Sequence, residues 1–279
     1  MSKKKYAVIG HPIGHTMSPF IHKRLFELSG IDASYGVLDI NPENLKNEYS
    51  TLRGLDGYNI TIPHKQAIIP LLNELDSKAE MYGSVNTVSN RDGISKGFTT
   101  DPDGFVKALE YASIPLSGRV VILGCGGVAR TMAYEALLKN ASLEFAVRPQ
   151  SVPKAQKLIA EIKSTLKNPD VSCVEIGALS GDITTLINAT PVGMSPKTEF
   201  QPVSDEIIKS SANVYDAIYN PLETVLIKKA RSNGSNAEGG MSMLVWQAVA
   251  AHKHWDGSNY DVKDIEQLCV DAAKELMKR

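Results

Sequence analysis

Hydrophobic and polar positions follow two rhythms along this chain. Short apolar runs at residues 6–9, 35–40 and 119–123 have the length and composition of buried strands. Between such runs, apolar residues recur every three to four positions, as at Ile21, Leu25 and Leu28, which is the spacing of a helix with one buried face. Strands that alternate with helices predict βαβ units and a largely parallel sheet, so we expect an α/β fold.

Cap and turn signals predict where these elements begin and end. Ser18-Pro19 and Asn41-Pro42 are typical of helix starts, and Gly30 is typical of a helix end. From Met241 onward the pattern is helical, with no further strand. The same signals predict a helix over 128–139 and further strands at 57–62, 85–89, 143–147, 171–176, 185–188 and 214–218.

The chain is long enough for two domains. Its 279 residues exceed what one compact core of ordinary size holds. A second α/β block begins near Gly118, and the stretch 113–118 looks like a linker before it. Because a helical tail often packs back on an earlier domain, we expect residues 1–103 and 240–279 to form one domain. Residues 104–239 would form the other.

Composition and charge exclude several classes of protein. Apolar residues make up 43% and charged residues 22%, which excludes disordered and fibrous chains. With 30 basic and 31 acidic residues, the net charge is −1, so neither nucleic acid nor a membrane is an expected partner. No apolar run approaches the ~18 residues that span a bilayer, and no signal-peptide stretch opens the chain. The three cysteines lack metal-ligand spacing, so we expect no metal site and a reducing, cytoplasmic setting.

A glycine-rich segment directly after the strand at 119–123 predicts a dinucleotide site. Gly124, Gly126 and Ala129 fit the pattern G-x-G-x-x-A, and helical sequence follows. The first glycine permits a tight turn, the second lets the backbone approach a pyrophosphate, and the small alanine lets helix and strand pack closely. The helix N-terminus would face the anion. We expect the cofactor to contact Gly124, Gly126, Gly127, Val128 and Ala129; the alternative is a merely tight turn.

The end of the next strand indicates which dinucleotide binds. An acidic residue there would bond the ribose 2′-hydroxyl of NAD, whereas an arginine suits the 2′-phosphate of NADP. The sequence has Arg148 there, Lys154 follows, and no acidic residue stands at the strand end. We therefore expect NADP rather than NAD; the alternative is that Arg148 is only a solvated surface charge.

Polar side chains gather where strands of the first block end. Thr16 and Ser18 offer two hydroxyls, Lys65 follows Thr61 at the end of a strand, and Asp101 stands at a junction of strand and helix. In open α/β sheets, ligands bind at the carboxyl ends of strands, so Lys65 and Asp101 are expected to face one crevice. Such a pair can donate and accept a proton beside a carbonyl or an alcohol.

The same crevice is expected to hold a small polyhydroxylated acid. The hydroxyls of Thr16 and Ser18 suit its carboxylate, and Thr61 and Asn86 would help to hold the molecule. Simpler alternatives remain for individual residues, because Ser18 and Asp101 are also common helix N-caps and an isolated lysine is usually a solvated charge. A nucleotide loop in one block and an acid–base pocket in the other together indicate hydride transfer.

The chain resembles the shikimate/quinate dehydrogenase family over nearly its whole length. The resemblance rests on many motifs in the right order, at residues 9–19 with His22, 59–65, 85–87, 100–101 with Gly104, 124–130, 188–194, Asp216, 219–221 with Thr224, and 239–241 with Met243, Leu244 and Gln247.

The resemblance implies a fold, an activity and a set of site residues. It implies an N-terminal substrate domain, a Rossmann-type NADP-binding domain, and C-terminal helices that return to the first domain. The implied reaction is reversible NADP-dependent reduction of 3-dehydroshikimate to shikimate, towards chorismate and the aromatic amino acids, by a monomer or homodimer. It also implies a catalytic pair of Lys65 and Asp101, and Thr16 and Ser18 on the carboxylate. The remaining implied ligands are Thr61, Asn86, Tyr219 and Gln247 for the substrate and Gly240 beside the nicotinamide.

The sequence departs from the family pattern at a few positions. Thr16 stands where serine is usual, Thr99 where asparagine is usual and Pro191 where serine is common. Val147 and Pro149 flank Arg148 in place of side chains that usually help to bind NADP. These departures leave two alternatives open: a quinate/shikimate dehydrogenase that prefers NAD, and a nucleotide-sensing protein that kept the fold without catalysis. Retention of both Lys65 and Asp101 argues against the sensor.

Overall fold

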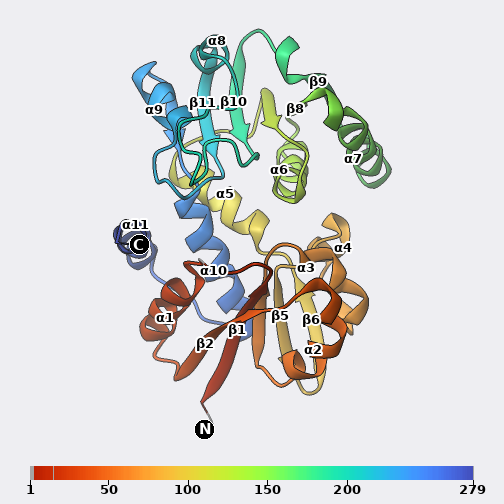
Figure 1. The fold of residues 1–279 in the computed structure, drawn as a ribbon, viewed down its shortest axis with the longest axis vertical. Helices are drawn as coiled ribbons and strands as arrows, with labels where there is room; N and C mark the ends of the chain where they lie inside the picture. The colour runs from red at the N-terminus through yellow and green to blue at the C-terminus, as the bar shows by residue number, and fades with distance from the viewer. Residues whose placement is uncertain (1–2, 15, 279) are drawn as a thin grey trace. The chain divides into compact units, whose positions relative to one another are not determined.

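The computed structural model describes residues 3–14 and 16–278, which divide into two compact units. Unit 1 comprises Met1–Gly104 and Val245–Arg279, and unit 2 comprises Phe105–Leu244 (Figure 1). The domain limits expected at 103–104 and 239–240 stay a prediction. The stretch 113–118, expected to be a linker, lies inside unit 2. Helix α5 (Asp101–Tyr111) precedes it and buries Phe105 against Tyr215, with ring centroids 5.3 Å apart.

Unit 1 is built on a six-stranded mixed sheet in the order β2-β1-β3-β5-β6-β4. β1 (Lys4–Gly10) lies parallel to β2 (Ala33–Asp39) and to β3 (Gly57–Ile60). β5 (Thr87–Arg91) runs antiparallel to β3 and to β6 (Ile94–Phe98), and β4 is Glu74–Leu75. The sheet is largely parallel, as the sequence predicts: β5 runs against the other five strands, because Asp92 and Gly93, with φ of 53° and 76°, turn β5 directly into β6.

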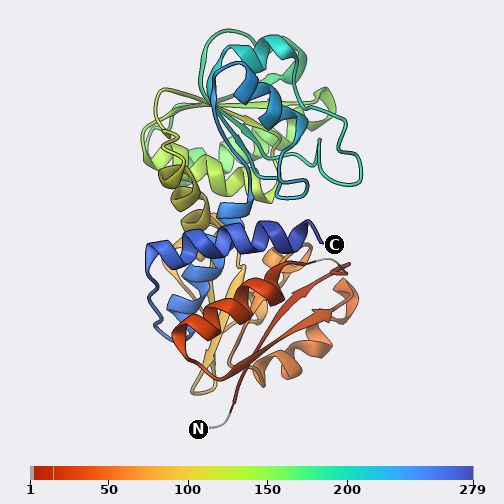
Figure 2. The same ribbon diagram turned by 90° about the vertical axis from the view of Figure 1, so that its left-hand side faces the viewer.

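Helices cover both faces of this sheet because side chains alternate along its strands. On one face, Ile9, Tyr58 and Val88 pack with Leu52 of α2 (Leu45–Arg53) and Ala79 of α4 (Ser77–Tyr82). The other face carries α1 (Ser18–Ser29), α10 (Met241–Trp255) and α11 (Val262–Leu276), which Figure 2 draws in front of the strands. The short α3 (His64–Ala67) follows β3, and 3₁₀ turns occur at Pro42–Asn44 and Ile69–Leu71.

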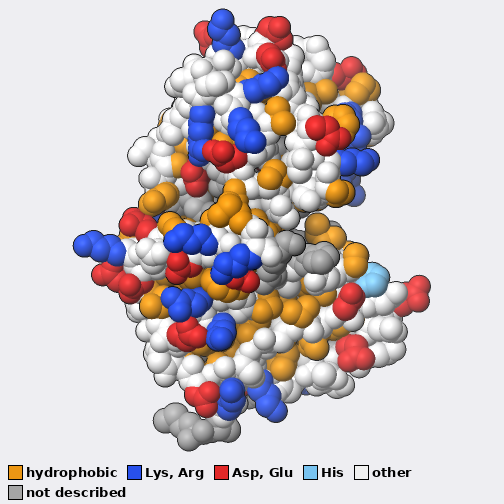
Figure 3. All heavy atoms as spheres, turned by 60° about the vertical axis from the view of Figure 1, so that its left-hand side comes forward, with side chains coloured by type: hydrophobic (Ala, Val, Ile, Leu, Met, Phe, Trp, Pro, Cys, Tyr) orange, Lys and Arg blue, Asp and Glu red, His pale blue; other side chains and the backbone are white. Residues whose placement is uncertain are grey.

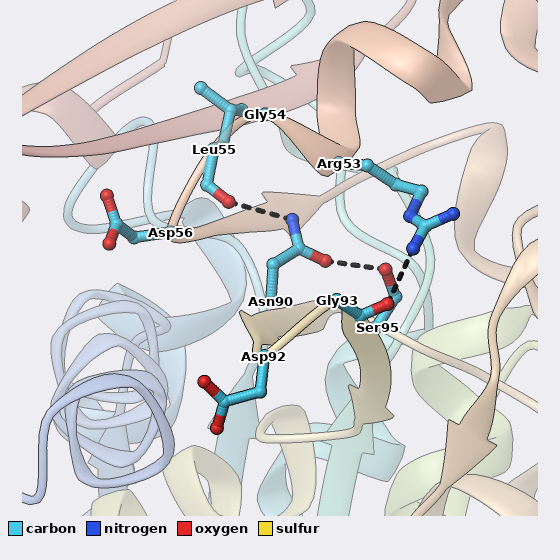
Figure 4. Close-up of a pocket in the computed structure, with 8 residues that line it drawn as sticks. All are labelled: Arg53, Gly54, Leu55, Asp56, Asn90, Asp92, Gly93 and Ser95. Atoms are coloured by element: carbon cyan, nitrogen blue, oxygen red, sulfur yellow. Dashed lines mark hydrogen bonds between the residues drawn. The ribbon is translucent and has the colours of Figure 1, made fainter.

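Hydrogen bonds among the residues of a small polar pocket hold the β5–β6 hairpin against the turn after α2 (Figure 4). The Asn90 amide donates to the carbonyl oxygens of Leu52 and Leu55, and its oxygen accepts from Ser95. Arg53 donates to the Gly93 carbonyl at 2.5 Å. Because these donors and acceptors are paired with one another, the contacts stabilise the fold.

Unit 2 is a parallel sheet in the order β12-β11-β10-β7-β8-β9, which is the strand order of a Rossmann fold. Its strands are β7 (Arg119–Leu123), β8 (Ser142–Val147), β9 (Val171–Glu175), β10 (Ile183–Asn188), β11 (Ser211–Asp216) and β12 (Asn236–Glu238). Its helices, besides most of α5, are α6 (Gly127–Leu138), α7 (Val152–Thr165), α8 (Asp205–Lys209) and α9 (Val225–Ser232), with 3₁₀ turns at Pro149–Ser151 and Ile176–Ala178. The expected two-domain α/β fold is confirmed.

The surface agrees with the balanced charge of the sequence. On the face drawn in Figure 3, basic and acidic side chains are interspersed and not gathered by sign. On α1, for example, Glu27 pairs with both Lys23 and Arg24. Among the described residues, none of the helices is both long enough and apolar enough to cross a bilayer.

Candidate active site

Lys65 and Asp101 form an ion pair in unit 1. The Lys65 Nζ lies 2.5 Å from Asp101 Oδ2, and the two side chains are 24% and 14% exposed. Lys65 belongs to α3, directly after β3, whereas Asp101 begins α5, just after β6. β3 and β6 point the same way because each is antiparallel to β5 between them. Their carboxyl ends therefore meet at one edge of the sheet, as the sequence predicts.

Asn86 orients the carboxylate of this pair. It immediately precedes β5, is only 2% exposed, and donates from Nδ2 to Asp101 Oδ1 at 2.8 Å. Its own oxygen accepts from the Thr100 backbone N–H at 2.7 Å, which fixes which way the amide faces. Gln247 of α10 reaches the same place, with Oε1 3.4 Å from Asn86 Nδ2. Both oxygens of Asp101 thus have a donor, and one of them is Lys65.

The two hydroxyls of the expected carboxylate clamp, Thr16 and Ser18, touch each other. Thr16 Oγ1 donates to Ser18 Oγ at 3.1 Å and accepts from the Ser18 N–H at 3.2 Å. Ser18 is not the N-cap of α1: Met17 holds that position, and Ser18 is the first helical residue. The motif at 9–19 includes His15, which lies outside the described residues.

The loop that carries Thr16 and Ser18 runs beside the segment that carries Thr61 and Lys65. The His11 N–H donates to the Ile62 carbonyl at 3.0 Å, and the Thr61 N–H donates to the Ile9 carbonyl at 2.9 Å. Gly10 is required for this close approach, because a Cβ there would come within 2.5 Å of the Thr61 methyl group. Backbone bonds therefore hold the segments of Thr16 and Thr61 together.

The glycine-rich loop in unit 2 has the geometry of an anion site. Gly124 has φ +94°, and a Cβ there would come within 2.9 Å of the Thr190 methyl group. Gly126 is the N-cap of α6, and a Cβ at Gly126 or Gly127 would meet no atom within 4 Å. Ala129 is fully buried where α6 packs on the sheet. The start of α6, with Val128 in its first turn, is thus open to a phosphate.

The other residues expected at the cofactor lie in unit 2 as well. Arg148 follows β8 and is exposed, and Lys154 is exposed in the first turn of α7. Gly240 donates its N–H to the Ile218 carbonyl at 3.0 Å, and a Cβ there would collide with the Ala217 carbonyl oxygen. Tyr219, expected at the substrate, is half-buried after β11 and belongs to unit 2, unlike the other substrate residues. The roles of all the site residues stay predictions.

A buried carboxylate ties together the loops that follow β10 and β11. Asp216 accepts from Asn188 Nδ2 at 3.0 Å, from the Ile218 N–H at 3.1 Å and from Thr224 Oγ1 at 2.7 Å. Burial is the largest influence and raises the pKa of Asp216 from 3.8 to about 6, although these three donors oppose the rise. The native state therefore binds a proton that the unfolded state releases between these two pH values.

This linkage predicts that Asp216 lowers stability as pH rises from about 4 to about 6. A shift of about two pKa units corresponds to about 3 kcal/mol. Asp216→Asn removes the buried charge. The free energy of unfolding of the variant minus that of the wild type should therefore be about 2–3 kcal/mol larger at pH 7 than at pH 4. Urea unfolding of both proteins at the two pH values measures this, with the exposed Asp170→Asn as control. An equal difference at both pH values would contradict the prediction.

The sequence did not predict a set of hydrogen-bonded polar side chains in the sheet of unit 1. Tyr35 of β2 donates to Asn59 Oδ1 at 2.7 Å, and Asn59 Nδ2 donates to Thr87 Oγ1 at 3.0 Å. Thr100 is fully buried against Asn86. A polar run on a sheet face that carries helices is the signal that could have found them, since buried polar groups need partners.

Known proteins similar to this chain have the same extent and fold. Residues 8–88 match the family model described as the shikimate dehydrogenase substrate binding domain. A shikimate dehydrogenase (NADP(+)) from Geobacillus kaustophilus is 37% identical over 276 residues, covering 98% of this chain and 99% of that protein. Shikimate 5-dehydrogenase from Thermus thermophilus, solved with NADP(H) and shikimate, is 29% identical with a TM-score of 0.85, covering 96% and 99%. The Listeria monocytogenes enzyme, solved with shikimate and NAD, is 28% identical with a TM-score of 0.83, covering 95% and 96%.

Proposed function

The chain belongs to the shikimate dehydrogenase family, and from this premise we propose that it is an NADP-dependent oxidoreductase. Its reaction is the reversible reduction of 3-dehydroshikimate to shikimate, in the synthesis of chorismate and the aromatic amino acids. The observation that carries the proposal is the Lys65–Asp101 pair at 2.5 Å, held by Asn86 at the sheet edge in unit 1.

Unit 1 supplies the groups that such a substrate needs. A carboxylate accepts hydrogen bonds, and Thr16 and Ser18 offer two hydroxyl donors at the start of α1. A ring with hydroxyl groups needs donors and acceptors together, which Asn86, Gln247 and Thr61 provide. In the direction of reduction, the carbonyl oxygen gains negative charge as hydride arrives, and the Lys65 ammonium is placed to stabilise and protonate it.

Unit 2 supplies the groups that a dinucleotide needs. NADP would provide or take up the hydride when bound. Its pyrophosphate fits the open start of α6 at Gly126 and Gly127, where a side chain would otherwise stand. Arg148 and Lys154 are the cations for its 2′-phosphate, and Gly240 is a neighbour for the nicotinamide.

Replacing Arg148 with alanine is expected to lower kcat/KM for NADP roughly 10- to 100-fold and to leave NAD nearly unchanged, because one charge-assisted bond is worth about 1.5–3 kcal/mol. Because Val147 and Pro149 add no side-chain donor, we expect the preference for NADP over NAD to be weaker than is usual in the family. Steady-state kinetics with both cofactors measures the effect. Lys157→Ala, an exposed lysine on α7, is the matched control. Equal losses for NADP and NAD would remove Arg148 from 2′-phosphate recognition.

Two alternatives and two further expectations accompany the proposal. The Listeria structure with NAD is the observation that keeps an NAD-preferring quinate/shikimate dehydrogenase as second candidate. A nucleotide sensor would bind NADP without turning over shikimate. We place the protein in the cytoplasm as a monomer or homodimer, which light scattering on the purified chain distinguishes. The activity itself is tested by following NADPH oxidation in the presence of 3-dehydroshikimate; a protein that binds both compounds without turnover would contradict it.

A further inference from the structure

Two buried polar side chains lie side by side where adjacent strands of unit 2 end. Asn188 is the last residue of β10 and Asp216 the last residue of β11, and the two are register partners in the sheet (Figure 1). Both are fully buried, and Asn188 Nδ2 donates to Asp216 Oδ1 at 3.0 Å. Because buried polar groups need partners from the protein, the remaining bonds of this pair hold the loops that follow the two strands.

One arm of this network reaches the glycine-rich loop. Asn188 Oδ1 accepts from the N–H and from the hydroxyl of Thr190, at 3.0 and 2.7 Å. The Thr190 hydroxyl also accepts from the Val192 N–H at 3.2 Å, so the side chain is held in one orientation. Its methyl group lies only 2.9 Å from where a Cβ on Gly124 would stand. Asn188 thus sets Thr190 against the first glycine of the loop that is expected to bind the pyrophosphate.

The second arm reaches the segment that is expected beside the nicotinamide. Asp216 Oδ1 accepts from the Ile218 N–H at 3.1 Å, and the Ile218 carbonyl accepts from the Gly240 N–H at 3.0 Å. A Cβ at Gly240 would collide with the Ala217 carbonyl oxygen, so Gly240 packs directly on the backbone of residues 217–218. The bond to Asp216 therefore also fixes the backbone against which Gly240 packs.

Both arms bond to the same oxygen of Asp216. Oδ1 accepts from Asn188 and from Ile218. Oδ2 accepts instead from the hydroxyl of Thr224, the N-cap of α9, at 2.7 Å. The Ala217 N–H donates to the Asn188 carbonyl at 3.0 Å, and this backbone bond needs no side chain at position 216. The strand ends would therefore stay paired without the Asp216 carboxylate, while the two arms would lose the acceptor that they share.

We propose that Asp216 is a positioning residue for the dinucleotide, acting through the two segments that bond to its Oδ1. One segment carries Thr190, and the other lies against Gly240. This inference rests on the proposed function, because the roles of the glycine-rich loop and of Gly240 belong to it. Oδ1 holds the two segments in place before the cofactor arrives, so the cost of ordering them is met during folding and not during binding.

Two substitutions of Asp216 should differ, because only one of them keeps the shared acceptor. Asparagine can place its oxygen towards Asn188 and Ile218 and its amide towards the Thr224 hydroxyl, which can accept. Alanine leaves both donors without this acceptor and both segments free to shift. We expect Asp216→Ala to raise the Kd for NADP about 10-fold or more, and Asp216→Asn to keep it within about threefold of the wild type.

Thr224→Val is the matched control, because it removes a bond to the same carboxylate at the other oxygen. Valine keeps the shape of the side chain and leaves Oδ1 bonded to both arms. The loss of the N-cap should lower the melting temperature of this variant. Its Kd for NADP should nevertheless stay within about twofold of the wild type, because both segments keep their acceptor.

Calorimetric titration with NADP, and separately with shikimate, separates positioning from simple loss of folded protein. A partly unfolded variant would show fewer binding sites and an unchanged affinity in the folded fraction. The Kd for shikimate should stay within about threefold of the wild type in every variant, because all but one of the residues expected to bind it lie in unit 1.

A further variant tests one arm alone and decides the question if Asp216→Ala does not fold. Asn188→Ala removes the bonds to Thr190 and leaves the second arm on Asp216. It should raise the Kd for NADP about 3- to 10-fold. Where both single variants fold, Asp216→Ala should add less in the Asn188→Ala background than it does alone, because one of the two arms is already gone.

The outcomes distinguish this inference from the proposed function. Wild-type turnover of shikimate, with a Kd for NADP of Asp216→Ala within about twofold of the wild type or with equal rises for alanine and asparagine, would overturn the role of Asp216 alone. Equal rises in the Kd for NADP and for shikimate would do the same. A wild-type protein that binds NADP without oxidising shikimate would overturn the activity, while the NADP titrations would still decide the role of Asp216. A wild-type protein that binds neither compound would overturn both.

Discussion

Replacing Lys65 with methionine is expected to lower kcat by at least about 100-fold while changing the KM for shikimate far less, because a positioned proton transfer contributes about 10²- to 10⁴-fold. Methionine keeps the length and the packing of the side chain and removes only the charge and its protons. The Lys65 ammonium lies 2.5 Å from Asp101, at the edge of the sheet where strands end. Stabilisation of a charge that develops only in the transition state appears in kcat.

A second lysine in unit 1 provides the control. Lys78 also pairs with an aspartate, Asp103, at 2.8 Å, and its side chain is more exposed than that of Lys65. Lys78→Met should therefore keep the kcat of the wild type. A Lys65→Met variant with kcat within a few-fold of the wild type would remove Lys65 from proton transfer.

Replacing Asp101 with asparagine is expected to lower kcat strongly and also to raise the KM for shikimate. Oδ2 of the carboxylate holds Lys65, and under the proposed function the side chain also accepts a hydroxyl hydrogen from the ring of the substrate. An amide in the same position turns a donor towards either Lys65 or Asn86, each of which is itself a donor. The bonds that orient the ammonium are therefore lost along with the charge.

The alternative that Asp101 is the N-cap of α5 is wrong, because Asp101 is the first helical residue and the Thr100 carbonyl accepts the bond that opens the helix. Asparagine keeps the shape of the side chain, so a residue with only a local role in the helix would tolerate the change. Kinetics and a melting curve on Asp101→Asn, with Asp103→Asn as control, give the comparison. Wild-type kinetics together with a wild-type melting temperature would show that Asp101 serves the helix and not the reaction.

The parts of the fold that sequence predicts are those with strong local patterns. The strand at 119–123 and the glycine loop after it appear as β7 and the start of α6, because a long apolar run and fixed glycines leave few alternatives. The short strands β4 and β12 have two and three residues and little apolar pattern, so the sequence predicts no strand at either place. For β6 the sequence indicates only that a strand ends before Asp101. Their pairing is set by tertiary contacts.

The site residues also divide into those that the sequence predicts and those that depend on tertiary contacts. Lys65 and Asp101 were expected together because carboxyl ends of strands share an edge, and the structure brings them to 2.5 Å. The bond from Tyr35 to Asn59 joins strands that are separated by β1, and no local pattern encodes it. Reading Ser18 as an N-cap was wrong because the helix begins one residue earlier than a cap at that position requires.

The most direct test of the proposed activity is a matrix of kcat/KM values for the purified chain, with shikimate and quinate each assayed with NADP and with NAD. We expect the highest value for shikimate with NADP. A highest value for quinate or shikimate with NAD would contradict the assigned cofactor and favour the catabolic alternative. No turnover in any of the four combinations, from a folded protein that binds NADP, would contradict catalysis itself.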